Sequence, residues 1–252
     1  MRRFYFRVGP WLFVAAVAWY LAGNFLIGSL EAKSQARALS LHKTSQDFEI
    51  GTQGVVEVHT EGEELNMQTV KIDFQPGASL ATVQNENLRV SVRGQLVDGV
   101  LHLTVGGSDR RHYASRKEVS LVLPPSVKRL RFPDAGRFEV TGRVPNPAAD
   151  LNLEILNCHS EVNVKHLSVH QLTLTSSCQM HVEAQAEKRC CNMRFDLDRD
   201  VVVSKLDVSM ESGSFEFRGN AIPQTQLHVG ELVEVTGRRA FLQAARFAKP
   251  LR

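Results

Sequence analysis

Short runs of alternating apolar and polar residues occupy most of this chain from Phe48 onward. Gly, Asn, Asp, Ser or Pro residues often separate the runs, which include VVEVHTEG, VKIDF, LRVSVRG, VLHLTVGG, FEVTG, LNLEI and FEFRG. A period of two residues places apolar side chains on one face of a β-strand, so each run indicates a short strand with one buried face. The pattern predicts an all-β domain and leaves a sandwich, a barrel or a solenoid as its architecture.

An approximate repeat favours the solenoid. Most copies contain an alternating apolar pair, a corner of small residues and a second alternating pair; they are LRFPDAGRFEVTG (130–142), LEILNCHSEVNVK (153–165), LTLTSSCQMHVEA (172–184), LDVSMESGSFEFRG (206–219) and LHVGELVEVTG (227–237). Equivalent apolar positions recur about every 19 residues, a spacing typical of stacked solenoid coils; they are Val140, Val164, Val182, Val203, Phe217 and Val235. We therefore predict a right-handed β-helix (a β-solenoid) over residues 47–237, with a distorted β-sandwich as the alternative.

The N-terminal segment has a different composition. From Val8 to Leu30 no residue is charged, and a stretch of about 20 apolar residues is long enough to cross a bilayer. Three arginines precede it, which favours a cytoplasmic N-terminus. We expect a cytoplasmic tail (1–7), an uncleaved single-pass transmembrane anchor (8–30), a polar stalk (31–46) and an exported domain. A cleaved signal peptide is the alternative, although the stretch is long for one and no A-x-A site follows it before Glu31.

Charge and motifs exclude several functions. The formal net charge is only +3, and the charges are scattered instead of forming a basic stripe, so we expect no nucleic-acid partner. The sequence contains no G-x-S-x-G elbow, no H-E-x-x-H motif and no phosphate-binding Gly-rich loop. We therefore expect a protein that is not an enzyme and that uses no cofactor.

Three segments of the chain resemble a known family. They are DFEIGTQGVVEVHTEGEE, LPPSVKRLRFPDAGRFEVTG and LDVSMESGSFEFRG, and they are similar to the GIN-type domain, a β-helical domain of bacterial envelope proteins often labelled a "putative autotransporter-adhesin head". The resemblance covers residues 47–237 and implies a fold, but no catalytic residues. With the anchor, it implies a bacterial inner-membrane protein whose C-terminal domain lies in the periplasm. The chain departs from the family pattern at Cys158, at His159 and in RCCNMRFDLDRD (189–200).

Cys158 and Cys178 lie in successive copies of the repeat. Solenoid coils stack about 4.8 Å apart, so cysteines at the same position of neighbouring coils would meet the Cα separation of about 4.4–6.8 Å that a disulfide requires. Three interpretations remain open: buried core thiols, a Cys158–Cys178 disulfide, or a metal site that would need further ligands from Cys190 and Cys191. We favour core thiols, keep the disulfide as a candidate and predict no metal site.

The run FDLDRDV places Asp196, Asp198 and Asp200 at alternate positions. On a strand these carboxylates would share one face about 7 Å apart, which suits calcium binding or acid–base chemistry on a glycan. The simpler interpretation, which we favour, is that Phe195 and Leu197 point into the core while the aspartates face water.

The C-terminal residues 238–252 change to a helical pattern. Phe241, Leu242, Ala245 and Phe247 can share one face of a short helix that ends at Pro250. Such a helix would cover the exposed end of a solenoid. A basic helix lying on anionic lipid is the alternative.

These observations predict a membrane-anchored, non-catalytic binding, adhesion or scaffold module whose partner is an envelope protein or a glycan. The alternative function is a carbohydrate-active β-helix enzyme that uses the Asp196–Asp200 face.

Overall fold

The structure is a computed structural model, and it describes residues 44–61, 69–85, 90–107, 118–142, 149–177 and 192–248 of the 252-residue chain. The predicted tail (1–7), the predicted anchor (8–30) and residues 31–43 of the predicted stalk lie outside the described residues. In the part that is described, no helix has the length and apolar character to cross a membrane. Residues 44–252 form one compact unit.

Strands dominate the described residues, and one short helix, α2 (Arg239–Ala244), lies near the C-terminus. The strands are β1 (Thr44–Phe48), β2 (Val55–Glu61), β3 (Thr69–Phe74), β4 (Ala81–Asn85), β5 (Val90–Val97), β6 (Val100–Gly107), β7 (Glu118–Leu123), β8 (Arg129–Phe132), β9 (Arg137–Gly142), β10 (Asp150–Ile155), β11 (Glu161–Val164), β12 (Ser168–Ser176), β13 (Arg194–Leu197), β14 (Val202–Phe217), β15 (Gln224–Gly237) and β16 (Arg246–Ala248). The predicted all-β class is confirmed.

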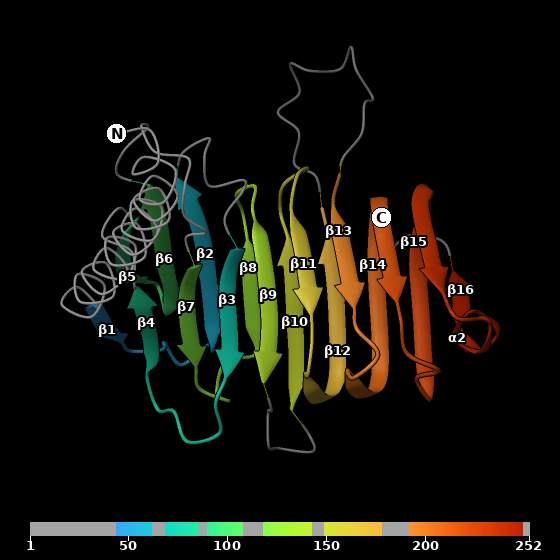
Figure 1. Cartoon of the computed structure of the whole chain (residues 1–252), viewed down its shortest axis with the longest axis horizontal. Helices are drawn as coiled ribbons and strands as arrows, with labels where there is room; N and C mark the ends of the chain where they lie inside the picture. The colour runs from blue at the N-terminus through green and yellow to red at the C-terminus, as the bar shows by residue number, and fades with distance from the viewer. Residues whose placement is uncertain are drawn as a thin grey trace, which may run out of the picture. The chain divides into compact units, whose positions relative to one another are not determined.

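Most strands form two layers, which we call face A and face B (Figure 1). Face A contains, in spatial order, β6, β2, β8, β10, β12 and the first halves of β14 and β15. Face B contains, in the same order, β7, β3, β9, β11, β13 and the second halves of β14 and β15. All of these neighbours are parallel. The layers belong to one sheet, because β14 and β15 run from one face to the other, and this sheet nearly closes where β4 and β5 approach each other.

Alternate residues of each strand point between the two layers and form apolar rows. This follows from the period of two in the sequence, which gives every strand one apolar side. Removal of these rows from water is the main favourable contribution to folding. The row under face A is Leu101, Val56, Leu130, Leu153, Leu174, Val208 and Leu227, and the row under face B is Leu121, Ile72, Val140, Val164, Leu197 and Phe217, with no member more than 2% exposed.

Pairs of consecutive strands, one on face A and the next on face B, form two-strand units. These units do not stack in chain order. The unit of β2 and β3 lies between the unit of β6 and β7 and the unit of β8 and β9. A tight hairpin leads into β6, with Asp98 and Gly99 at φ 50° and 79°, the positive values that an Asp-Gly hairpin turn adopts. Antiparallel strands finish this end of the sheet, because β5 pairs with β6, β4 with β7 and β1 with β4. They protect the parallel edges from pairing with other chains.

The other end of the core is covered by α2. Phe241 is fully buried, and its ring centroid lies 4.9 Å from that of Phe217 and 6.1 Å from that of Phe215. The predicted terminal helix is therefore present but shorter than expected. It ends at Ala244, and the chain continues as β16, which pairs with β15. The prediction that Phe247 shares a face with Phe241 is wrong, since Phe247 lies on this strand and is 56% exposed.

The repeat predicted some rows correctly and others incorrectly. Val140, Val164 and Phe217 do belong to one buried row. Val203 and Val235, which we assigned to the same row, instead pair with Val169 and Phe215. The second strand expected at the end of 172–184, which contains Val182, lies outside the described residues. Among the described strands, β11 pairs with β9 and β13. The last three residues of the predicted stalk, 44–46, belong to β1.

Candidate functional site

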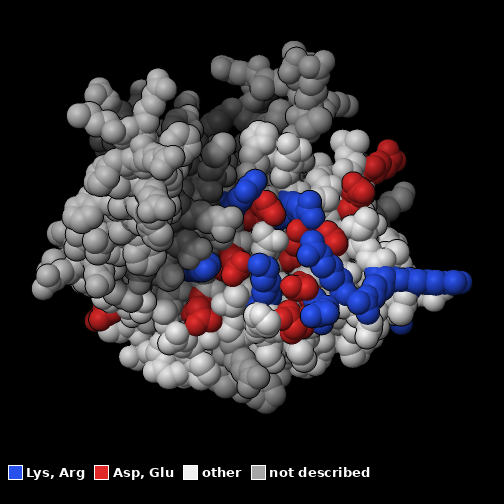
Figure 2. All heavy atoms as spheres, viewed as in Figure 1, with Lys and Arg blue, Asp and Glu red and all other residues white. Residues whose placement is uncertain are grey.

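The outer surface of face B carries charged side chains that pair with one another. Figure 2 shows Lys and Arg side chains interleaved with Asp and Glu over this face. Where the described residues form this face, positive and negative charges therefore offset each other locally. The shortest N···O distances are 2.7 Å for Lys165–Glu139, 3.4 Å for Arg137–Glu161, 2.9 Å for Arg194–Glu216 and 2.9 Å for Arg218–Glu216.

Asp196, the first aspartate of the predicted acidic face, is engaged by arginines. It lies on β13 and is only 6% exposed, so the prediction that it faces water is wrong. Arg194 Nε donates a hydrogen bond to Asp196 Oδ1 at 2.8 Å, and Arg218 Nη2 lies 3.8 Å from Oδ2. The hydrogen bond to Asp196 raises the pKa of the Arg194 guanidinium. The neighbouring Phe195 and Leu197 point into the core, as predicted.

The other two aspartates of that run are not on a strand. β13 ends at Leu197, so Asp198 and Asp200 belong to the turn that follows. Asp198 accepts a hydrogen bond from the backbone N–H of Arg199 at 2.7 Å. Asp200 accepts one from the backbone N–H of His166 at 3.1 Å, and this bond lowers the pKa of the Asp200 carboxyl group. The predicted face of three aligned carboxylates is therefore wrong, because the chain turns after Leu197.

Cys158 takes part in a disulfide, so the interpretation of this residue as a free core thiol is wrong. The other three cysteines of the chain, Cys178, Cys190 and Cys191, lie outside the described residues. The pairing of Cys158 with Cys178 stays a prediction.

Face A carries a line of mixed polar side chains, which we call the polar row. Each member lies beside the next on the neighbouring strand, so the row crosses six strands. At a strand spacing of about 4.8 Å, the row is ~24 Å long. Its members, in spatial order from β8 to β16, are Arg129, Asn152, Thr173, Asp207, Gln226 and Arg246.

Two surface hollows lie along the polar row. One, of about 340 Å³, is lined by Arg129, Asn152 and Thr173 together with neighbouring residues. The other, of about 430 Å³, is lined by Gln226 and Arg246 together with neighbouring residues. The row therefore contains recesses at both ends, where a ligand lying across the strands can contact side-chain amides, hydroxyls and cations.

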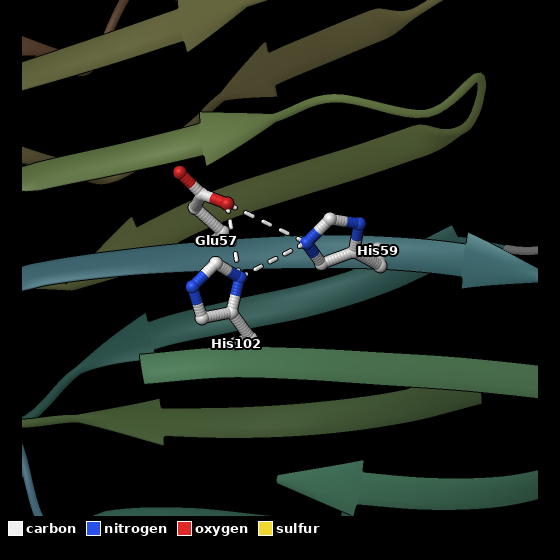
Figure 3. Close-up of side chains that lie close together, drawn as sticks. All are labelled: Glu57, His59 and His102. Atoms are coloured by element: carbon white, nitrogen blue, oxygen red, sulfur yellow. Dashed lines mark hydrogen bonds and ion pairs between the residues drawn. The ribbon is translucent and has the colours of Figure 1, made fainter. Parts of the chain in front are cut away.

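A compact cluster of Glu57, His59 and His102 lies beyond the β8 end of the polar row (Figure 3). Glu57 and His59 are two residues apart on β2 and share its outer side, and His102 stands directly beside Glu57 on β6. His102 Nδ1 is 3.0 Å from Glu57 Oε2, and His59 Nε2 is 3.5 Å from the same oxygen. The two imidazole nitrogens, His59 Nε2 and His102 Nδ1, are 3.3 Å apart.

Further polar contacts hold the cluster in place. His59 Nδ1 lies 3.0 Å from Asp134 Oδ2 in the turn between β8 and β9, and the hydroxyl of Thr60 donates to the carbonyl of Ala135 at 2.7 Å. Arg131 Nη1 donates to Glu57 Oε1 at 2.9 Å, and this bond raises the pKa of Arg131. The contacts of His59 with Asp134 and of Glu57 with Arg131 restrict the orientations of two cluster side chains.

Sequence reasoning missed this cluster. The alternation V-E-V-H in β2 and L-H-L in β6 placed Glu57, His59 and His102 on outer positions of their strands, which was a usable signal. It gave no reason to place β6 beside β2. Three strands, β3, β4 and β5, lie between them in the chain, yet β2 and β6 are neighbours in the sheet.

Comparisons with known proteins give little further information. No family model matches the chain, and no curated protein matches it. One solved structure, described as a "putative cell adhesion protein" from Clostridium sporogenes ATCC 15579, has 6% sequence identity and a TM-score of 0.28, with 77% of this chain and 95% of that chain covered. Another, a "putative lipid binding protein" from Parabacteroides distasonis ATCC 8503, has 10% identity and a TM-score of 0.34, with 82% and 97% covered. At these TM-scores neither likeness bears on fold or function.

Proposed function

We propose that this chain is a non-catalytic binding module of the bacterial envelope that holds an extended polar ligand, a glycan strand, across face A. The observation that carries the proposal is the polar row, which crosses six strands and has a hollow at each end. A ligand that lies across parallel strands meets equivalent positions at regular intervals of about 4.8 Å. A polymer of repeating polar units suits such a surface.

The chemistry of the row favours a glycan over a protein. Protein interfaces depend on a few buried aromatic or aliphatic anchors. Among the described residues, the exposed large apolar side chains are Leu80, Leu96, Val97, Val202, Leu232 and Phe247, and none of them belongs to the polar row. The row instead presents the amide of Gln226 and the hydroxyl of Thr173, which donate to and accept from sugar hydroxyls, and the amide N–H group of Asn152, whose oxygen is buried.

The architecture we propose for this surface is a β-solenoid. Its support is the sequence of parallel two-strand units, in which Leu151 on β10 pairs with Leu172 on β12 and Phe215 on β14 pairs with Val235 on β15. Coils of this kind give each outer position a fixed spacing from its neighbours. Such a rigid surface loses little conformational entropy when it binds a ligand.

We propose binding without catalysis because the candidate acidic residues have other roles. Asp196 is paired with Arg194, and Asp198 and Asp200 accept backbone hydrogen bonds. A glycosidase needs two carboxyl groups on opposite sides of the scissile bond. Three carboxylates held by local partners do not provide that arrangement.

The proposal includes the N-terminal anchor at residues 8–30 and an exported domain. A reporter that is active only outside the cytoplasm, fused after Arg252, is expected to give signal. Activity of a reporter that works only in the cytoplasm would contradict export, and a mature chain that begins after residue 30 would contradict the anchor.

Binding and cleavage are distinguished by one experiment with the full chain in detergent. The protein is incubated with soluble envelope glycans, including peptidoglycan fragments, and both the retained glycan and newly formed reducing ends are measured. We expect retention without new reducing ends. Reducing ends that disappear in Asp196→Asn would support the enzyme instead, and a lack of retention of every glycan would contradict the proposed function.

A further inference from the structure

We propose that Glu57, His59 and His102 bind one divalent transition-metal ion, with zinc as the ion that fits best. Among the described residues, these three side chains each offer one ligand atom, and the three atoms lie within 4.8 Å of one another. The site is separate from the polar row and goes beyond the proposed glycan binding. Figure 3 shows the carboxylate and both imidazole rings converging from two neighbouring strands.

The distances between the three ligand atoms match those around a metal ion. The edges of the triangle are 3.0, 3.3 and 3.5 Å. Tetrahedral zinc, with bonds of about 2.0–2.1 Å, places neighbouring ligand atoms about 3.3 Å apart. A point about 2.05 Å from all three atoms therefore exists beside the triangle, so metal binding requires no rearrangement of the strands.

A second observation is the carboxylate behind His59. Asp134 Oδ2 lies 3.0 Å from His59 Nδ1, so Nδ1–H donates to the carboxylate and the lone pair of Nε2 points into the cluster. This carboxylate–histidine arrangement is the usual support of a metal-binding imidazole. Asp134 is itself fixed, because its Oδ2 accepts from the backbone N–H of Thr60 at 3.3 Å.

The local charges permit a dication. Glu57, Asp134 and Glu154 contribute three negative charges, and Arg131 and Arg129 contribute two positive charges. Arg131 is shared between Glu57 and Glu154, with N···O distances of 2.9 Å to both. The net negative charge favours binding of a cation, and the hydrogen bond from Arg131 leaves the second oxygen of Glu57, Oε2, directed at the histidines.

The ligand types select the class of ion. Imidazole nitrogen suits zinc, copper and nickel, whereas magnesium and calcium prefer oxygen ligands alone. Three protein ligands leave a fourth position of a tetrahedral ion for water. The side chains of His59 and His102 are 30% and 32% exposed, so the ion is accessible and exchangeable.

Without metal, polar contacts hold the cluster together, because His102 Nδ1 lies 3.0 Å from Glu57 Oε2 and 3.3 Å from His59 Nε2. A metal ion takes the place of the proton between these atoms, since a ligating imidazole nitrogen must present a lone pair. In a neutral His102 this proton moves to Nε2 of the same ring, so metal binding through Nδ1 changes the tautomer without a net loss of a proton.

The test uses the full chain in detergent, freed of metal by a chelator and titrated with Co²⁺, followed by displacement with Zn²⁺. We expect one equivalent with the intense visible absorption of four-coordinate cobalt, which zinc abolishes. His102→Gln and His59→Gln are each expected to lose this equivalent. Asp134→Asn, which keeps all three ligands, is expected to bind about 10–100-fold more weakly.

His170→Gln, a substitution of the exposed His170 on β12, is the matched control and is expected to bind as the unchanged protein does. Zinc is expected to raise the unfolding temperature of the unchanged protein and of this control, but not of His102→Gln. If the ligand variants and the unchanged protein bind the same number of ions with the same affinity, the proposal is wrong. An Asp134→Asn variant with unchanged affinity would overturn the supporting role of Asp134.

Discussion

Glu57 and His102 stand side by side on β2 and β6, with 3.0 Å between Oε2 and Nδ1, although β3, β4 and β5 separate the two strands in the chain. The pairing exists because the unit of β6 and β7 stacks on the unit of β2 and β3, on the side opposite to β8 and β9. This order places a glutamate and two histidines together at one end of face A. The polar row occupies the rest of the same face.

The period-two arrangement of the core predicts unequal effects at neighbouring positions. Phe217 is 2% exposed, and Phe217→Ala is expected to lower the free energy of unfolding by about 3–5 kcal/mol, measured by denaturant titration. Arg218, whose side chain is 52% exposed, faces outward, and Arg218→Ala is expected to cost less than about 1 kcal/mol. Equal losses at both positions would contradict the alternation of buried and exposed residues at the end of β14 and the residue that follows it.

The pair of Arg194 and Asp196 is expected to stabilise the fold more than an exposed pair does. The Asp196 side chain is only 8% exposed. In Arg194→Ala, its remaining arginine partner would be Arg218, at 3.8 Å. We expect a loss of about 2 kcal/mol, below the range for a fully buried pair because Arg194 is itself half exposed. Arg137→Ala, which removes an exposed partner of Glu161, is the control and is expected to cost about 0.5 kcal/mol or less. A similar loss in both variants would show that the burial of Asp196 is unimportant.

The pH dependence of stability is expected to include a contribution from Glu216. A hydrogen bond from Arg218 lowers the pKa of the Glu216 carboxyl group in the folded protein. A lowered folded pKa stabilises the fold above the ordinary glutamate pKa of about 4.3, and this stabilisation is lost as the pH falls through the folded value. The free energy of unfolding should therefore fall less between pH 7 and pH 3 in Glu216→Gln than in the unchanged protein. We expect the two decreases to differ by up to about 1 kcal/mol. Glu234→Gln, at an exposed position, is the comparison, and an identical effect there would contradict the assignment.

The helix α2 is expected to act as a cover for the core. Phe241→Ala removes a fully buried ring that packs against Phe217 at 4.9 Å, and it should cost about 3–5 kcal/mol. It should also increase self-association, measured by light scattering, because the apolar end becomes accessible. Phe247→Ala is the matched control, since this ring is 56% exposed and its loss should be close to neutral. A monomeric, fully stable Phe241→Ala variant would contradict the covering role.

The sequence was most informative where local pattern determines structure. Alternation alone predicted the buried positions of Val140, Val164 and Phe217, because a strand with one apolar side can bury only that side. It failed at Asp198 and Asp200, since the end of β13 depends on a turn that alternation does not reveal. It also failed to place Leu197 beside Val164, because a repeat of fixed length cannot accommodate the longer connection between β12 and β13. The Glu57, His59 and His102 cluster depends on the stacking order of units, which is set by long-range packing.

The central claim is that face A, and not face B, binds a glycan, and paired variants test it most directly. Asn152→Ala/Thr173→Ala removes an amide and a hydroxyl from the polar row, and Asn163→Ala/Thr236→Ala removes the same groups from the outer side of face B. Each asparagine donates to a glutamate two residues away on its own strand, at 2.7 Å for Asn152 and 3.1 Å for Asn163, so the two variants disturb similar local contacts. With the best-retained glycan as ligand, the account predicts a dissociation constant at least about 10-fold higher for the face A variant, from the loss of two or more hydrogen bonds, and no change for the face B variant. Equal affinities for both variants, or a loss confined to face B, would contradict it.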